Sequence, residues 1–162
     1  MLIDEKRSAV LIQGVFKDTF FGLLKKCKAK NIVVLEGRPR LDGAKIVCRK
    51  LLKSKITPTL ISDNMAGFLF YKDLVKEIWI AYQSENQTEA VCDIGALILG
   101  VLGKQHNVPV YLYPAARKTK GVAASKDILT FNGQRVAPKG AKGYVPLIEK
   151  LPKKYITEIY HE

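Results

Sequence analysis

The candidate ligand-binding residues are charged side chains that each lie just after an apolar segment. They are Glu36, Arg38, Arg40, Asp63, Arg117, Lys118 and Lys120. Arg38 and Arg40 belong to the loop EGRPR (36–40), which directly follows the apolar segment NIVVL (31–35). Because guanidinium and ammonium groups hold phosphate and carboxylate groups, these residues predict a phosphate site or a site for an acidic partner. The alternative is a structural ion pair of Arg38 with Glu36 or Asp63, and both roles can coexist.

Alternating helix and strand patterns must position these side chains. We expect strands at 31–35, 59–62, 77–82 and 109–114, and helices at 4–28, 41–54, 64–71 and 88–106, with Asp63 as the N-cap of the third helix. Nearly continuous apolar strands are typical of a parallel sheet that is covered on both faces. The alternation therefore predicts an α/β fold, a Rossmann-like open, mostly parallel twisted sheet with helices on both faces.

The pattern changes after residue 114. The segment DILTFNGQRVAP (127–138) carries Asn132-Gly133 between two alternating runs, which predicts a C-terminal β-hairpin. Residues 152–160 predict a short helix or a closing strand. Ligands in open α/β sheets bind beyond the carboxyl ends of the strands, where helix N-termini offer free N–H groups to anions. The charged side chains that follow the strands should therefore meet at one edge of the sheet.

Length and composition limit the class of protein. The chain has 162 residues, of which 48% are hydrophobic, and this suits a single domain over 1–162. No apolar run approaches the roughly 18 residues of a membrane-spanning helix, and the start MLIDEKRSAV does not fit a secretory signal. The cysteines Cys27, Cys48 and Cys92 are scattered, as expected of small buried thiols in a reducing compartment. We expect a cytoplasmic protein without membrane contact.

The strongly basic composition indicates an anionic ligand or partner. The formal net charge is +12, with 27 Lys and Arg against 15 Asp and Glu. Lys dominates over Arg, and neither an RNA-recognition aromatic signature nor zinc-finger spacing occurs, so nucleic acid is the weaker expectation. The chain lacks a GxGxxG loop and a Walker lysine loop. His106 and His161 have no metal-ligand partner nearby in sequence, so we expect neither a cofactor nor a metal.

Four segments, taken in order, carry a resemblance to a known family. LEGRPRLDGAKIVCRKL resembles the ETRP…QGAR…A..L signature of the initiation factor 2B alpha/beta/delta family. TPTLISDNMAG, DIGALILGVLGKQHNVPVYL and the closing segment from RVAPKGAKGYVPLIEK to the end resemble later motifs of that family. The family includes regulatory subunits of the translation factor, methylthioribose-1-phosphate isomerases and ribose-1,5-bisphosphate isomerases. The resemblance covers about residues 10–162 and implies the family's C-terminal Rossmann-like domain, with its helical N-terminal domain absent.

The resemblance also implies where catalytic groups should stand. The isomerases use a Cys in a loop that corresponds to LIQGVFKDT, where Gln13 and Gly14 stand here. Their catalytic Asp corresponds to AYQSEN, at Gln83 or Ser84, and their Asn-Lys pair corresponds to Cys92-Asp93, where the Asp would repel phosphate. Moving a proton between neighbouring carbons needs an acid/base pair. These replacements imply a degenerate active site, in which Glu36, Arg38 and Asp63 still match the family pattern.

Three functional interpretations remain open at this point. The first is a non-catalytic relative of initiation factor 2B, a ligand- or partner-binding module with a degenerate sugar-phosphate pocket and no catalytic residue. The second is a sugar-phosphate (aldose–ketose) isomerase that uses other residues, such as Lys118 or Lys120 with Asp63. The third is an RNA- or ribosome-associated basic protein. The resemblance further implies a homodimer, and it allows a phosphorylated small molecule, a translation factor or another protein as partner.

Overall fold

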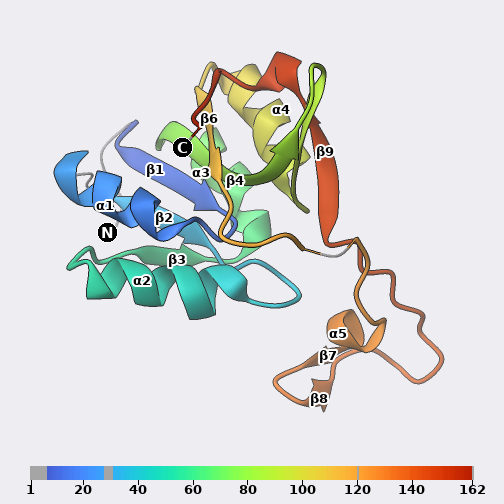
Figure 1. Cartoon of the computed structure of the whole chain (residues 1–162). Coiled ribbons are helices and arrows are strands. Elements are labelled where there is room, and N and C mark those ends of the chain that lie inside the picture. Colours follow the sequence, from blue (N-terminus) through green and yellow to red (C-terminus); the bar gives the residue numbers. More distant parts are fainter. Residues whose placement is uncertain (1–6, 28–30, 120, 162) are drawn as a thin grey trace.

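A parallel sheet forms the centre of the molecule. The computed structural model describes residues 7–27, 31–119 and 121–161. Its parallel strands lie in the order β10-β6-β4-β1-β2-β3 (Figure 1). Their bounds are β1 Ala9–Gln13, β2 Ile32–Leu35, β3 Thr59–Ile61, β4 Val75–Glu85, β6 Val110–Pro114 and β10 Glu158–Ile159. This is the strand order of the doubly wound dinucleotide-binding fold, so the expected Rossmann-like class is confirmed.

Two antiparallel strands extend the sheet at one end. β4 runs on past the parallel region to Glu85, and there it pairs with β5 (Glu89–Asp93), which in turn pairs with β9 (Ile148–Pro152). The turn between β4 and β5 is held by Asn86, whose side-chain oxygen accepts hydrogen bonds from the backbone N–H groups of Thr88 and Glu89. This extension brings the carboxyl end of β5 beside the end of β1, where Gln13 Nε2 lies 3.4 Å from the Asp93 carbonyl oxygen.

Helices cover both faces of the sheet, as expected. On one face α1 (Asp18–Cys27) and α2 (Cys48–Lys53) pack on the sheet, and a π-helical turn over Gly43–Val47 leads into α2. On the other face lie α3 (Ala66–Tyr71) and α4 (Ala96–His106), together with β9. Each face therefore has its own apolar core, and the strands β1 and β2 between them are buried at every position. No helix within the described ranges is long and apolar enough to cross a membrane.

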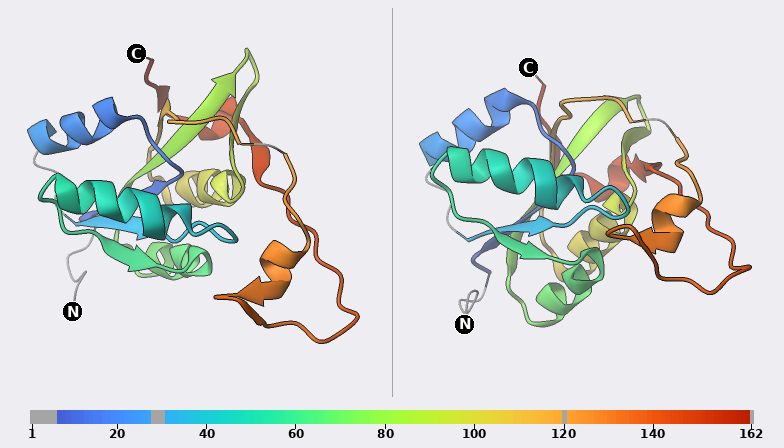
Figure 2. Two further views of the ribbon diagram at one scale, coloured as in Figure 1. Left: turned by 60° about the horizontal axis from the view of Figure 1, so that its bottom comes forward. Right: turned by 90° about the horizontal axis from the view of Figure 1, so that it is seen from below.

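A small hairpin stands apart from the sheet. α5 (Lys126–Leu129), β7 (Thr130–Phe131) and β8 (Gln134–Arg135) belong to an excursion between β6 and β9, which we call the arm (residues 121–147). Figures 1 and 2 show the arm reaching away from the sheet (orange). Asn132 and Gly133 form its turn with φ values of 50° and 78°, as a two-residue hairpin of this sequence requires. The expected C-terminal hairpin is confirmed.

The main errors in the expected elements concern two helices. Residues 9–13, expected to be helical, form the central strand β1, because the segment AVLIQ is buried at every position and such a run does not reveal its period. Likewise the segment expected to start a helix at residue 88 forms β5, and α4 begins only at Ala96. Gly95 lies between them with φ of 101°, which ends the strand and turns the chain into the helix.

One smaller expectation also needs correction. Asp63 begins a 3-10 turn (Asp63–Met65) ahead of α3, but the N-cap position belongs to Ser62, and no side chain caps this turn. The closing segment contains both alternatives, a 3-10 turn over Lys153–Tyr155 and the strand β10.

Candidate functional site

A cleft opens at the carboxyl ends of β1 and β2, beside the point where the strand order of the sheet reverses. Its lining residues are Gln13, Gly14, Gly37, Arg38, Pro39, Arg40, Asp42, Gly43, Asp93, Ile94, Thr119 and Leu147. About 420 Å³ of space there is free of protein atoms, open solvent included. In doubly wound sheets the crevice at the reversal of strand order, here between β1 and β4, is the usual place for a ligand.

Gly14 ends β1 at this crevice. Its φ is 90°, and a Cβ atom on it would lie 2.7 Å from the Cβ of Ala81 on β4. Only glycine meets both conditions, the left-handed backbone and the close approach of the neighbouring strand. The chain can therefore leave β1 sharply, and the crevice stays open beside it.

The loop after β2 is anchored by Asp63. Its two carboxylate oxygens accept hydrogen bonds from the backbone N–H groups of Gly37 (2.9 Å) and Arg38 (2.7 Å). The expected pairing of Asp63 with Arg38 therefore exists, but through the main chain of Arg38 rather than through its guanidinium. The guanidinium lies instead 4.8 Å from the ring centre of Phe131 in the arm. The loop is thus fixed while the Arg38 side chain lines the cleft.

The other residues of the expected anion site differ in whether they line the cleft. Arg40 is exposed and lines the cleft beside Arg38. Arg117 forms an ion pair with Asp42, which lines the cleft. Lys118 is exposed, and no hydrogen bond or ion pair links it to Asp63 in the described part of the chain. Lys120 lies outside the described residues, and Glu36 is half-buried but does not line the cleft.

The N-terminus of α4 is already occupied by a side chain. The Glu149 carboxylate on β9 accepts hydrogen bonds from the backbone N–H groups of Gly95 (2.7 Å) and Leu97 (2.8 Å). The expectation that this helix offers free N–H groups to an anion therefore fails here. Arg38 and Arg40 of the β2 loop are cationic side chains that line the cleft.

Gln13 forms the inner wall of the cleft. Among the described residues it is the one polar side chain that is buried, with 6% of its surface exposed. Its Nε2 donates to the carbonyl oxygens of Ile94 (2.7 Å) and Asp93 (3.4 Å). Its Oε1 has no hydrogen-bond partner among the described residues. The position that the resemblance gives to a catalytic Cys thus carries a rigid amide with one unused acceptor.

Asp93 places a carboxyl group in the same cleft. Gln83 donates from Nε2 to Asp93 Oδ1 (2.9 Å), and the Thr119 backbone N–H donates to Gln83 Oε1 (2.7 Å). Burial raises the pKa of Asp93 above its usual value near 3.8, and the nearby Asp42 adds to this, while the hydrogen bonds and Arg117 act against it. Burial therefore makes the charged form of Asp93 less favourable than that of a carboxyl group in water.

Asp42 is a second carboxyl group in the cleft, and sequence reasoning missed it. The expected ligand edge ended at Arg40, two residues earlier, although Asp42 also precedes a helical segment. Its neighbour Gly43 lets the helical turn approach β2 closely, since a Cβ there would lie 1.9 Å from the Leu35 carbonyl oxygen. Asp42 is ion-paired with Arg117, whereas Asp93 is buried beside an amide. Two carboxyl groups in unlike environments suit the two ends of a proton transfer.

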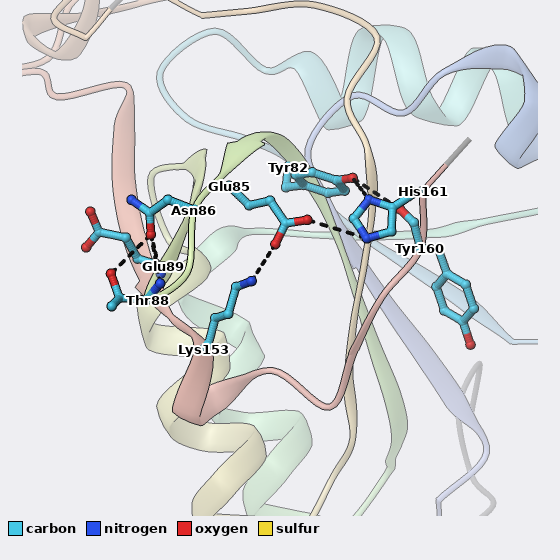
Figure 3. Close-up of polar contacts among 8 residues, drawn as sticks. All are labelled: Tyr82, Glu85, Asn86, Thr88, Glu89, Lys153, Tyr160 and His161. Carbon is cyan, nitrogen blue, oxygen red and sulfur yellow. Dashed lines mark hydrogen bonds and ion pairs between the residues drawn. The ribbon is translucent and has the colours of Figure 1, made fainter.

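A second polar cluster lies beyond the other end of the sheet extension (Figure 3). The Glu85 carboxylate pairs with Lys153 Nζ (2.7 Å) and with His161 Nε2 (3.5 Å). His161 Nδ1 lies 3.3 Å from the Tyr82 hydroxyl, which also donates to the Tyr160 carbonyl oxygen (3.2 Å). We call these residues the terminal clasp, because they tie the chain end to β4.

Cysteine and metal chemistry find little support in the described residues. Burial raises the pKa of the Cys92 thiol to about 12, and burial also raises the pKa of Cys48. Neither residue lines the cleft, and a thiol that stays protonated is a poor nucleophile. In the described ranges no group of three or more His, Cys, Asp or Glu residues could hold a metal ion.

Comparison with known proteins finds methylthioribose-1-phosphate isomerases among the relatives of this chain. A methylthioribose-1-phosphate isomerase of Syntrophus aciditrophicus is 32% identical over 147 residues, which cover 83% of this chain and 40% of that protein. A methylthioribose-1-phosphate isomerase of Thermus thermophilus is 27% identical over 147 residues, covering 83% of this chain and 44% of that one. The chain thus spans less than half the length of these relatives.

Solved structures confirm the fold. The delta subunit of translation initiation factor eIF-2B from A. fulgidus superposes with a TM-score of 0.80 at 19% identity, over 96% of this chain and 52% of that chain. A 5-methylthioribose 1-phosphate isomerase from Pyrococcus horikoshii superposes with a TM-score of 0.81 at 21% identity, over 95% and 49%. The sequence pattern of the initiation factor 2 subunit family matches residues 13–162. The chain therefore belongs to the initiation factor 2 subunit family.

Proposed function

We propose that the cleft binds a phosphorylated aldose and isomerises it to the ketose. The supporting observation is the presence of two carboxyl groups in unlike environments, Asp42 and Asp93, between the arginine-bearing loop and the end of β1. Relatives of this chain carry the name methylthioribose-1-phosphate isomerase, so the first substrate to test is 5-methylthioribose 1-phosphate. The isomerase interpretation thereby replaces the non-catalytic one as the leading hypothesis.

The arginines of the β2 loop hold the phosphate in this proposal. Arg38 and Arg40 line the cleft, and the guanidinium of Arg38 lies over the ring face of Phe131. A phosphate forms charge-assisted hydrogen bonds with a guanidinium, and these are stronger than a contact with an aromatic ring at an exposed site. Ligand binding therefore draws Arg38 from Phe131 towards the phosphate, while Asp63 keeps the loop backbone in place.

The two carboxyl groups divide the proton transfer between them. The Asp42 carboxylate accepts the proton that leaves one carbon of the sugar. Asp93, whose charged form is disfavoured by burial, gives a proton to the neighbouring oxygen in this proposal, and the reverse transfers complete the move to the adjacent carbon. No net proton is gained or lost, as an isomerisation requires. Asp93 is held for this role by Gln83, which the resemblance had marked as a lost catalytic position.

A non-catalytic binding module is the second candidate. It is favoured by Gln13 and Gly14, which stand where the resemblance implies a catalytic Cys. It shares the phosphate site with the isomerase proposal and differs only in turnover. A matching fold in the delta subunit of eIF-2B is consistent with such a module.

Turnover distinguishes the two candidates. The whole chain is incubated with 5-methylthioribose 1-phosphate, and proton NMR follows the ketose product. We expect turnover by the wild type and a loss of about 100-fold or more in Asp93→Asn, because Asn keeps the hydrogen bond from Gln83 but cannot transfer the proton. Asp73→Asn, on a surface ion pair with Arg7, is the matched control. Binding without turnover would favour the non-catalytic module, and absence of both would contradict both candidates.

We also propose a cytoplasmic protein that works as a homodimer or with a translation-factor partner. The family's name and the similarity to a chain described as a subunit support an assembly of some kind. Analytical ultracentrifugation should then give twice the chain mass of 18.1 kDa. A species at the chain mass across micromolar concentrations would contradict the homodimer.

A further inference from the structure

The orientation of the Gln13 amide is fixed by its surroundings. Nε2 faces the carbonyl oxygens of Ile94 and Asp93. Exchanging the amide nitrogen and oxygen would set Oε1 against these two oxygens, and the hydrogen bonds would become repulsive. Gly95 makes room for this arrangement, since a Cβ there would lie 3.0 Å from Gln13 Nε2. The orientation of the amide is therefore fixed, and the acceptor atom Oε1 cannot exchange places with Nε2.

The unused acceptor is costly to the folded chain. Gln13 is 6% exposed, and Oε1 has no partner among the described residues. Buried polar atoms in native proteins are nearly always hydrogen-bonded, and each exception needs a physical reason. Gln13 is among the residues that line the cleft, and Oε1 itself is buried in the ligand-free chain. The reason we favour is a donor that reaches Oε1 when the ligand enters the cleft.

The chemistry of the cleft limits what that donor can be. The arginines Arg38 and Arg40 suit the anionic end of a ligand, and a fully ionised phosphate has no hydrogen to donate. The donor must therefore belong to the uncharged part of the molecule, as a hydroxyl group does. An acceptor that is rigid and desolvated rejects ligands that lack the matching donor, because its hydrogen bond is then left unmade.

We propose that Gln13 Oε1 accepts a hydrogen bond from a hydroxyl group of the ligand, so that the cleft selects hydroxyl-bearing phosphates over bare phosphate and over the deoxy analogue. This inference rests on the proposed function and adds to it a specificity-determining residue. Gln13 thereby has a binding role at the position that the family resemblance had indicated as a lost catalytic residue.

Isothermal titration calorimetry on the whole chain tests the selection without any substitution. The probes are ribose 1-phosphate, its 2-deoxy, 3-deoxy and 5-deoxy analogues, and inorganic phosphate. We expect one deoxy analogue to bind about 10-fold more weakly than ribose 1-phosphate, since one hydrogen bond to an otherwise unpaired acceptor is lost. Equal affinities for all three analogues and the parent would overturn the inference.

The variant Gln13→Met assigns the effect to the amide. Met has a similar length and no acceptor, so ribose 1-phosphate and the sensitive deoxy analogue should bind this variant equally, while inorganic phosphate binds as to the wild type. A persistent 10-fold difference in the variant would overturn the inference. The side-chain amide resonance of Gln13 in the wild type gives a second readout if the variant does not fold. It should shift with ribose 1-phosphate and not with the sensitive analogue, and the absence of such a difference would also overturn the inference.

The outcomes separate this inference from the proposed function. Sugar-phosphate binding that is indifferent to every hydroxyl and to Gln13 would overturn the inference alone. Failure of ribose 1-phosphate and 5-methylthioribose 1-phosphate to bind at all would overturn the proposed function, and the inference with it.

Discussion

The cleft lies at the carboxyl ends of β1 and β2 and the terminal clasp at the end of β4, and their polar groups differ in how far they are paired within the chain. In the clasp, Glu85 has two partners, Lys153 and His161, and the Tyr82 hydroxyl has its own. In the cleft, a buried acceptor of Gln13 has no described partner, and burial raises the pKa of Asp93. A structural contact satisfies its groups within the chain, whereas a binding site leaves some of them for the ligand.

The largest effect is expected from the residue that holds the cleft loop. Asp63→Ala removes two hydrogen bonds between a carboxylate and the backbone N–H groups of Gly37 and Arg38. The free energy of unfolding should fall by about 3 kcal/mol, measured by urea denaturation. Asp73→Ala, which breaks the surface pair with Arg7, should lower it by less than about 1 kcal/mol. Equal effects of the two variants would contradict the anchoring role of Asp63.

The next effect concerns the phosphate contact. Arg38→Ala should weaken the binding of 5-methylthioribose 1-phosphate by about 10- to 100-fold, because a hydrogen bond to a charged group contributes about 1.5–3 kcal/mol. The fold should survive, since Asp63 binds only the backbone of this residue. Calorimetry measures the affinity, and Arg49→Ala on the exposed side of α2 is the matched control. An unchanged affinity in Arg38→Ala would place the phosphate elsewhere.

A smaller effect should appear in the pH dependence of stability. The pKa of Asp93 is raised in the folded chain, so its neutral form is favoured there, and ionisation above the folded pKa costs stability. Asn resembles the neutral acid and does not ionise. Asp93→Asn should therefore be more stable than the wild type at pH 7, and the difference should disappear below the usual value near 3.8. Thermal unfolding at both pH values measures this, and a variant that is less stable at pH 7 would contradict it.

The smallest effect is expected in the terminal clasp. Glu85→Gln breaks ion pairs whose partners Lys153 and His161 are 38% and 66% exposed. Solvent screens such pairs, so the loss of stability should stay within about 1 kcal/mol and shrink further in high salt. Sugar-phosphate affinity should not change. A loss of affinity as large as that of Arg38→Ala would remove the distinction between clasp and cleft.

Local signals allowed part of this molecule to be predicted from its sequence. The hairpin turn at Asn132-Gly133 was predicted because two adjacent residues determine it. The parallel strands β2, β3, β4 and β6 were predicted from short apolar runs between turn residues. β1 was mistaken for helix because all five of its residues are buried, and burial on every side removes the alternation that identifies a strand.

The site itself could be predicted only in outline. The error at β1 hid that Gln13 ends a strand at the crevice, and the error at β5 placed Asp93 inside a helix. The cleft joins residues from positions 13, 42, 93 and 119, and no local pattern reports such distant pairs. The two hydrogen bonds that link Thr119 to Gln83 and Gln83 to Asp93 likewise form only in the folded chain. What the sequence did indicate was the basic loop after β2, because its charges follow directly on an apolar strand.

Chemical-shift mapping tests the central distinction most directly. Ribose 1-phosphate is titrated into the uniformly 15N-labelled chain, and the backbone amide resonances are followed. We expect the largest chemical-shift changes at the cleft amides of Gly14, Gly37, Arg38 and Thr119. The amide resonances of Lys153 and His161 in the clasp should not change. Shifts that centre on the terminal clasp, or no shifts at millimolar ligand, would contradict this expectation.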